Sequence, residues 1–357
     1  DATTGKEFGF VGGHFASLDF RGVRFTPDGK HLLTADSSGV VKVWDTARLT
    51  DPRKTSWPLP KAEAGWWWFW GPGSPPRLAV SGDGQRIAVA AAWARSGPDP
   101  HKQVYRTVVH IHDRTGGPTR TFSMPERENH HVSLVALSRS GRFLACADGA
   151  FFQSYPWLSE PPPSPCLTVW DLETGKEVTS RRDGLGVIVG LGFAGEELRV
   201  VSAPVPEGHT VPAGSRLRVW SARDGRPVRE IEAPVSAHDV GLKVEFSPDG
   251  QRLALHRLFH PTASSTISPG PSEAVIWTLD DPDKPPLRIP YTSLQRDRPN
   301  SSEFLAFSPD SRSILLGDPA GAVVHDAATG ERLSLVRFPV THRSASRFEE
   351  ARLALPS

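Results

Sequence analysis

The sequence predicts an all-β fold, a β-propeller of four-stranded antiparallel blades, and two repeated phrases support this prediction. The first phrase is the end of a strand, then a tight turn, then a second strand. It occurs six times, 53 to 61 residues apart, and starts at Phe25, Val80, Leu137, Phe193, Phe246 and Phe307. The second phrase is an apolar strand after each turn, and it starts at Val41, Val109, Leu167, Leu217, Ala274 and Val323. Regular self-similarity of this length indicates a repeat architecture.

The turn phrase has a physical basis in its residue types. In copies such as Ser247-Pro248-Asp249-Gly250, proline fixes φ, aspartate bonds to its own backbone, and glycine accepts a positive φ. A further short turn, such as Glu173-Thr174-Gly175, follows the second phrase and leads into another strand. Each unit therefore supplies four strands, which we name a, b, c and d, and no helical period competes with them.

A single four-stranded sheet of this kind cannot cover both of its faces. Radial stacking of the units buries the faces and leaves only short edges, which is the propeller arrangement. We therefore expect six recognisable blades.

The tryptophan-aspartate ends of strand c, the turn phrases and the pair Gly13-His14 resemble the WD40 repeat family, in the degenerate form found in bacterial proteins. The resemblance covers roughly residues 5–338. It implies a structural role for the repeat residues His14, Thr34, Trp44, Asp45, Trp170, Asp171, Trp220 and Trp277. His112 and His325 replace tryptophan in the second and sixth repeats, and Ser37-Ser38 stand where the family's turn aspartate would be, so the family's full hydrogen-bond network is not transferred.

The first residues resemble the end of a blade. Asp1–Glu7 read like Asp171–Glu177, which follow a strand-c tryptophan, so residues 6–12 are predicted to be an orphan strand d. We interpret residues 1–357 as one propeller domain with a tail at 339–357, and as a fragment of a longer protein. A full ring of seven blades and a further catalytic domain upstream both remain open.

The two ends of the predicted ring differ in loop length. The a–b and c–d turns are short, whereas long b–c and d–a connections lie together at the other end. The long b–c connections are 93–106, 149–165, 203–215 and 258–272, and the long d–a connections are 62–76, 125–131, 233–241 and 290–302. Neutral drift could produce such loops, because the closure entropy of added residues is only about 1 kcal/mol.

Aromatic residues in these connections favour binding over drift. Because large aromatic side chains are typical anchors of interfaces, we predict a binding surface there. Its candidate residues are Trp66, Trp67, Trp68, Trp70, Trp93, Tyr105, Phe151, Tyr155, Trp157 and Phe259. Part of the run 66–70 is expected in the core, since five adjacent side chains cannot all face outward.

Several classes of function find little support in the composition. Lys+Arg 41 against Asp+Glu 40 gives a net charge of +1, without the basic excess of a nucleic-acid binder. No apolar run is long enough to span a membrane, so we expect a soluble chain, with the compartment undecided. Cys146 and Cys166 alone cannot form a disulfide framework or a four-ligand zinc site. No metal site, cofactor or catalytic residue is predicted, although 13 histidines are present.

The sequence therefore predicts a non-enzymatic scaffold that binds a protein or peptide on the face of the long b–c and d–a connections. The alternative is a propeller hydrolase or lyase, with a histidine and carboxylate centre or a metal near the central channel. Inward clusters of histidine and carboxylate would favour the enzyme, and an exposed apolar patch would favour the scaffold. A purely structural domain is the third possibility.

Overall fold

The computed structural model describes most of the predicted strands and their short turns. The described residues are 23–35, 40–46, 56–58, 65, 67–68, 77–97, 103–114, 120–128, 132, 134–148, 166–181, 187–203, 216–221, 227–232, 239–259, 272–291, 304–308, 310–318 and 321–337. The predicted strand at 6–12 and the tail at 339–357 lie outside them.

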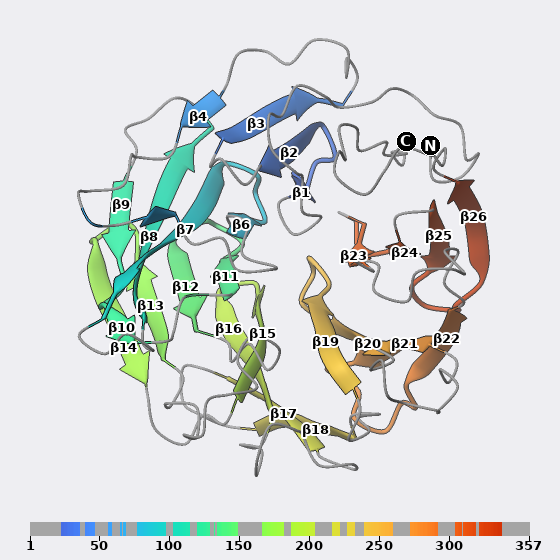
Figure 1. Ribbon diagram of the computed structural model, residues 1–357. Helices are drawn as coiled ribbons and strands as arrows, with labels where there is room; N and C mark the ends of the chain where they lie inside the picture. Colours follow the sequence, from blue (N-terminus) through green and yellow to red (C-terminus); the bar gives the residue numbers. More distant parts are fainter. Residues whose placement is uncertain are drawn as a thin grey trace.

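The described residues form six antiparallel sheets around a central axis, with strand a innermost and strand d outermost (Figure 1). This arrangement confirms the predicted all-β propeller. We number the sheets as blades 1 to 6 in chain order. Blade 1 contains β1 (Val23–Phe25), β2 (His31–Ala35), β3 (Val40–Asp45) and β4 (Ser56–Pro58).

Blades 3 to 6 each repeat the same four-stranded order. Blade 3 contains β11 (Leu134–Leu137), β12 (Phe143–Ala147), β13 (Leu167–Asp171) and β14 (Lys176–Arg181). Blade 4 contains β15 (Val187–Ala194), β16 (Glu197–Ala203), β17 (Arg216–Ser221) and β18 (Pro227–Glu232). Blade 5 contains β19 (Asp239–Phe246), β20 (Arg252–Phe259), β21 (Ser272–Thr278) and β22 (Leu287–Tyr291). Blade 6 contains β23 (Phe304–Phe307), β24 (Ser313–Asp318), β25 (Gly321–Asp326) and β26 (Arg332–Arg337).

Blade 2 is taller than the other blades. Its central strands β7 (Arg86–Ser96) and β8 (Gln103–Asp113) have 11 residues each. The half next to the a–b turn pairs with β6 (Arg77–Val80) and β9 (Arg120–Ser123), and the other half pairs with β5 (Trp67–Trp68) and β10 (Arg127–Glu128). We call this added half, 91–96 and 103–107 with β5 and β10, the second tier of blade 2.

The second tier corrects three predicted loop boundaries. The b–c connection of blade 2 is 97–102 rather than 93–106, because β7 and β8 continue their pairing to Ser96 and Gln103. The d–a connections 62–76 and 125–131 are likewise interrupted by β5 and β10. The sequence reads as loop here because each added strand has only two residues, too few to show an alternating pattern.

Apolar clusters join consecutive blades. Among the described residues there are five such clusters, and they join blade 1 to 2, 2 to 3, 3 to 4, 4 to 5 and 5 to 6. Trp170, Trp220 and Trp277 of strand c each pack toward the preceding blade. The apolar residues of a strand therefore serve two interfaces, one on each face, which explains why the strands lack a clean polar alternation.

The innermost strands of blades 4 and 5 approach so closely that glycine is required. A Cβ at Gly190 would lie 2.7 Å from Cγ1 of Val244, and a Cβ at Gly192 would lie 2.4 Å from Cδ2 of Phe246. Real Cβ atoms essentially never approach a neighbour this closely, so the two glycines let β15 and β19 pack against one another.

We predict that Gly192→Ala lowers the free energy of unfolding by about 1–3 kcal/mol, because the added methyl overlaps the ring of Phe246. Urea denaturation followed by fluorescence measures the change. Gly29→Asn is the control, since a Cβ at Gly29 would meet no atom within 4 Å, and asparagine accepts its backbone conformation of φ 65°. Equal stability of the Gly192→Ala variant and the parent would contradict the predicted close packing.

Candidate functional site

At the end of the ring with the short turns, side chains of the turns hydrogen-bond to one another and to the nearby backbone. In four a–b turns a serine or threonine hydroxyl donates to an aspartate two residues later, in the pairs Thr26–Asp28, Ser81–Asp83, Ser247–Asp249 and Ser308–Asp310. The same hydroxyl accepts the backbone N–H five residues later, and the aspartate accepts an N–H two residues later. The polar groups of these turns are therefore used within the fold.

These hydrogen bonds lower the pKa values of two of the turn aspartates, Asp28 and Asp310. Partial burial would raise the pKa of Asp28, but bonds from the Thr26 hydroxyl, the Lys30 N–H and the Arg114 guanidinium outweigh it and lower the pKa to about 2. The pKa of Asp310 is lowered in the same way, with burial opposed by the Ser308 hydroxyl and the Arg312 N–H. Carboxylates with lowered pKa values that serve turn geometry are structural groups, poorly suited to accept a proton in catalysis.

Arginines at the start of strand b join the blades at this end. Arg86, Arg199 and Arg252 each donate from Nη1 to a backbone carbonyl in the next blade's turn, at Gly141, Gly250 and Ser311, over 2.9, 3.0 and 2.9 Å respectively. All three acceptor residues have a positive φ. We call these three side chains the interblade arginines.

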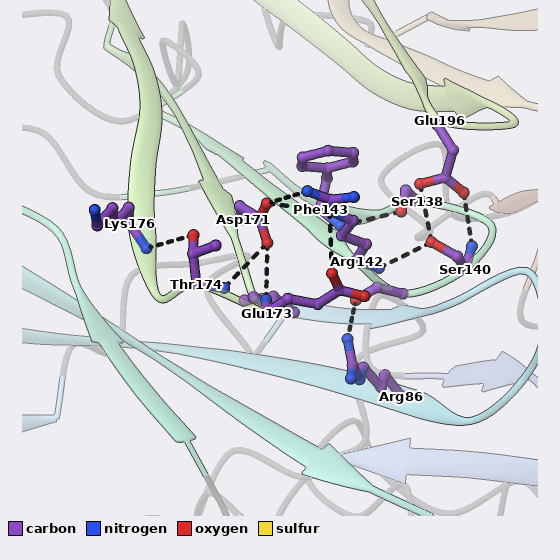
Figure 2. Close-up of polar contacts among 12 residues, drawn as sticks. Arg86, Ser138, Ser140, Arg142, Phe143, Asp171, Glu173, Thr174, Lys176 and Glu196 are labelled. Carbon is purple, nitrogen blue, oxygen red and sulfur yellow. Dashed lines mark hydrogen bonds and ion pairs between the residues drawn. The ribbon is translucent and has the colours of Figure 1, made fainter.

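Blade 3 has phenylalanine at this strand-b position and uses other contacts instead. Figure 2 shows Arg142 against Asp171, with Nε and Nη2 donating to Oδ2 over 3.0 and 2.7 Å. The bond from Arg142 lowers the pKa of Asp171, against the opposing effect of burial. The Ser140 hydroxyl and N–H both donate to the carboxylate of Glu196 in blade 4, each over 2.9 Å. Asp171 therefore bonds within blade 3, and Glu196 receives the contact from blade 3 to blade 4.

Strand d contributes a second set of arginine contacts. Arg120 of blade 2 donates to the carbonyl of Leu172 in blade 3. Arg229 of blade 4 donates to four carbonyls of blade 5, those of Thr278, Asp281, Pro282 and Lys284. A planar guanidinium with five donors suits several carbonyls at once, which explains why arginine rather than lysine stands here.

The interblade arginines are residues that the sequence prediction missed. A signal for them exists, because the phrase Gly-Gln-Arg recurs at 84–86 and 250–252. The role of the arginine in this phrase depends on the neighbouring blade, because the carbonyl that it contacts lies more than 50 residues away in the chain.

We predict that Arg86→Met lowers the free energy of unfolding by about 1–3 kcal/mol, because the Gly141 carbonyl and Asp113 both lose a charged donor. Arg216→Met is the matched control, since the Arg216 side chain is 70% exposed and only approaches Glu230 at 3.6 Å. Chemical denaturation of both variants measures the difference. Equal losses of unfolding free energy would show that the interblade bond of Arg86 adds no stability.

A second set of hydrogen bonds lies inside the blades. The indole Nε1 of Trp44 donates to Oγ1 of buried Thr34 over 2.8 Å, as the WD40 resemblance implies for the first repeat. Blade 4 repeats this bond, from Trp220 to Ser202 over 3.2 Å. In both blades the hydroxyl residue stands on strand b, two residues after the residue that pairs with the strand-c tryptophan. Cys146 occupies this position in blade 3, and Leu255 occupies it in blade 5. The network is thus retained in some blades and lost in others.

We predict that Thr34→Val lowers the free energy of unfolding by about 1–3 kcal/mol, because valine keeps the volume but leaves the buried Trp44 N–H without this acceptor. Thr179→Val in the outer strand β14 is the control and should cost much less. Thermal unfolding compares them, and an unchanged midpoint for Thr34→Val would show that this bond contributes nothing.

The strand ends that lead into the long connections lie at the opposite end of the ring, together with the second tier of blade 2. There the carboxylate of Glu126 accepts bonds from Arg106 at 2.7 and 3.1 Å and from Arg95 at 3.0 Å. These two guanidinium groups lower the pKa of Glu126. Arg127 of β10 pairs with the buried Asp148 of blade 3, so the second tier is attached to its neighbour.

The predicted aromatic surface falls largely outside the described residues, which do not include Trp66, Trp70, Phe151, Tyr155 and Trp157. Trp67 and Trp68 form β5 and pair with β7, and Phe259 ends β20. Trp93 and Tyr105 are strand residues of the second tier, 9% and 2% exposed. These two were expected in a loop, and they lie instead in extended, paired backbone.

The remaining predicted repeat residues lie at strand ends. Asp45 pairs in register with His31 at the end of β3, and Trp170 and Trp277 are buried in interblade clusters. His14 lies outside the described residues.

The metal-binding residue types do not gather into a site in the part of the chain that the structure describes. No group of three or more histidine, cysteine, aspartate or glutamate side chains there could hold a metal ion. Cys146 and Cys166 are free and buried, and burial raises the pKa of the Cys146 thiol. Among the same residues, no helix is long and apolar enough to cross a membrane.

Comparison with known proteins supports the repeat assignment. Residues 5–45 match the family model of the WD40 repeat, described as WD domain, G-beta repeat. No curated protein matches the chain. A solved structure, the β-propeller domain of Cps50 (Swd1) from Myceliophteria thermophila, superposes with a TM-score of 0.51 at 13% sequence identity, covering 93% of this chain and 90% of that one. The matched segment resembles one WD40 repeat, and the likeness to the solved structure shows the β-propeller fold.

Proposed function

We propose that the chain is a non-enzymatic scaffold that binds a protein or peptide segment on the face of the b–c and d–a connections. The observation that carries this proposal is the difference between the two ends of the ring. The short-turn end satisfies its polar groups internally, through the turn hydroxyls and the interblade arginines. The other end has the second tier of blade 2 and the connections 149–165, 204–215 and 260–271.

A rigid disc with variable connections on one end is a common basis for recognition. The strands fix the position of each connection, and the connections can change without disturbing the core. Here the second tier adds Arg95 and Arg106, both bonded to Glu126, at the end where the strands lead into the long connections. Aromatic anchors with arginine are the residue types in which binding energy concentrates.

Affinity capture from a lysate of the source organism tests the proposal. We expect a protein partner that the parent chain retains and that the variant Tyr155→Ser/Trp157→Ser loses, because these aromatic residues lie in the long connection of blade 3. Trp66→Ser/Trp70→Ser is the second variant, and it leaves the paired residues Trp67 and Trp68 of β5 unchanged. Circular dichroism confirms that each variant folds.

The control for the capture is Lys176→Ala/Glu177→Ala on β14, where both side chains are exposed at the short-turn end. This variant should retain the same partner as the parent. Titration calorimetry with the purified partner then gives the affinity, and a loss of tenfold or more is expected for the aromatic variants. Equal affinity for both aromatic variants and the parent would reject the proposed face, and loss in the control variant alone would place binding at the opposite end.

A further inference from the structure

The interface between blades 1 and 2 differs from the other described interfaces in its side chains. Its described apolar cluster contains the buried residues Leu33, Leu78, Ile87 and Val89. At the strand-b position where three other blades have an interblade arginine, blade 1 has His31. The arginine at this interface instead belongs to the following blade, where Arg114 of blade 2 donates to Asp28 of blade 1 over 3.2 Å.

Three histidines face this interface. His110 and His112 of β8 are paired in register with Val89 and Ile87, which belong to the interface cluster, and opposite residues of an antiparallel pair project from the same face. His31 shares a face of β2 with Leu33 of the same cluster, and its Nε2 lies 3.4 Å from Nη2 of Arg114. The interface thus contains a cluster of titratable rings from two blades.

We propose that the interface between blades 1 and 2 is an acid-sensitive joint, in which protonation of His31, His110 and His112 loosens blade 1 from blade 2 while the other described interfaces stay closed. The geometry gives each ring a reason to resist a proton. The rings of His110 and His112 have centroids 6.5 Å apart, and the Nε2 atom of each is buried. Nε2 of His31 can only accept from the Arg114 guanidinium, so a proton on it would set two cations against each other.

The direction of the effect follows from the two buried rings. Burial lowers the pKa of His110, and burial together with the charge on His110 lowers the pKa of His112 to about 4. Once the interface opens, both rings return toward the ordinary value of about 6.5. The open state therefore binds more protons between about pH 6.5 and 4, and falling pH favours opening across this window.

The other charged groups near the three rings do not reverse the effect of falling pH on the interface. Asp45 lies opposite His31 in the register of β2 and β3, and Arg114 approaches His31 from blade 2. Asp28 stays ionised, because its pKa is already low, and it is bonded to Arg114. Further along the same face of blade 2, Arg95 and Arg106 are paired with Glu126, and the uncharged Thr121 contacts Nδ1 of His110.

Blades 5 and 6 provide an internal comparison, because buried His256 and His325 also face one another's blades. There, however, Nδ1 of His325 lies 3.0 Å from the Gly330 carbonyl of its own blade. Arg252 also donates across that interface, to the Ser311 carbonyl. We therefore expect the interface of blades 1 and 2 to open at a higher pH than that of blades 5 and 6.

Hydrogen–deuterium exchange of the full chain at pH 7.5, 6.0 and 5.0, corrected for the intrinsic effect of pH, tests the joint. Amides of β2 and β3 should exchange at least tenfold faster at pH 5.0 than at pH 7.5, and amides of β20 and β21 should change less than threefold. Constant protection of blade 1, or an equal loss in blades 1 and 5, would overturn the proposal.

The variant His31→Gln/His110→Val/His112→Trp removes the titration and uses residue types that occur in the chain's other blades at the two β8 positions. Its blade 1 should keep the same protection at all three pH values, and an acid response equal to that of the parent would overturn the proposal. If this variant does not fold, His110→Gln/His112→Gln replaces it with the same expected result. His256→Gln is the control and should leave the acid response of blade 1 as in the parent.

Discussion

The packing of each blade against the next is the interaction on which the rest of this structure depends. A four-stranded sheet with apolar side chains on both faces is not stable alone, so every blade needs two neighbours. The strand-c tryptophans fill the interface with the preceding blade, and the interblade arginines reach the following one. One contact type is apolar and the other is a charged hydrogen bond to a carbonyl, so the first supplies burial and the second fixes the relative position of the blades.

The fold could be predicted from the sequence because its determinants are local and repeated. A turn such as Ser247–Gly250 needs only residues within the turn, and the structure shows the hydroxyl and carboxylate bonds that those residue types indicate. Strand c is recognised by its apolar residues and by the tryptophan that ends four of the six copies. The Thr34–Trp44 bond was within reach for the same reason, since both residues belong to one blade.

The candidate site was less predictable because its elements depend on contacts between distant segments. From the sequence, Trp93 and Tyr105 are interpreted as loop residues. The strands that pair beside them, β5 and β10, are only two residues long and are distant from them in the sequence. The interblade arginines were missed because an arginine after a glycine turn has many uses on a surface. Only the position of the next blade shows that its donor meets a backbone carbonyl.

Degeneracy of the repeat is a source of functional variety within one fold. Where a blade keeps the threonine or serine and the tryptophan, as in blades 1 and 4, the interior hydrogen bond is retained, over 2.8 and 3.2 Å respectively. Blade 2 instead has Val89 and His112 at positions where blade 1 has Thr34 and Trp44, and its interface with blade 1 acquires ionisable rings. A ring fold tolerates this substitution because each interface is stabilised by its own contacts. The same independence allows one blade to grow a second tier while its neighbours keep the common height.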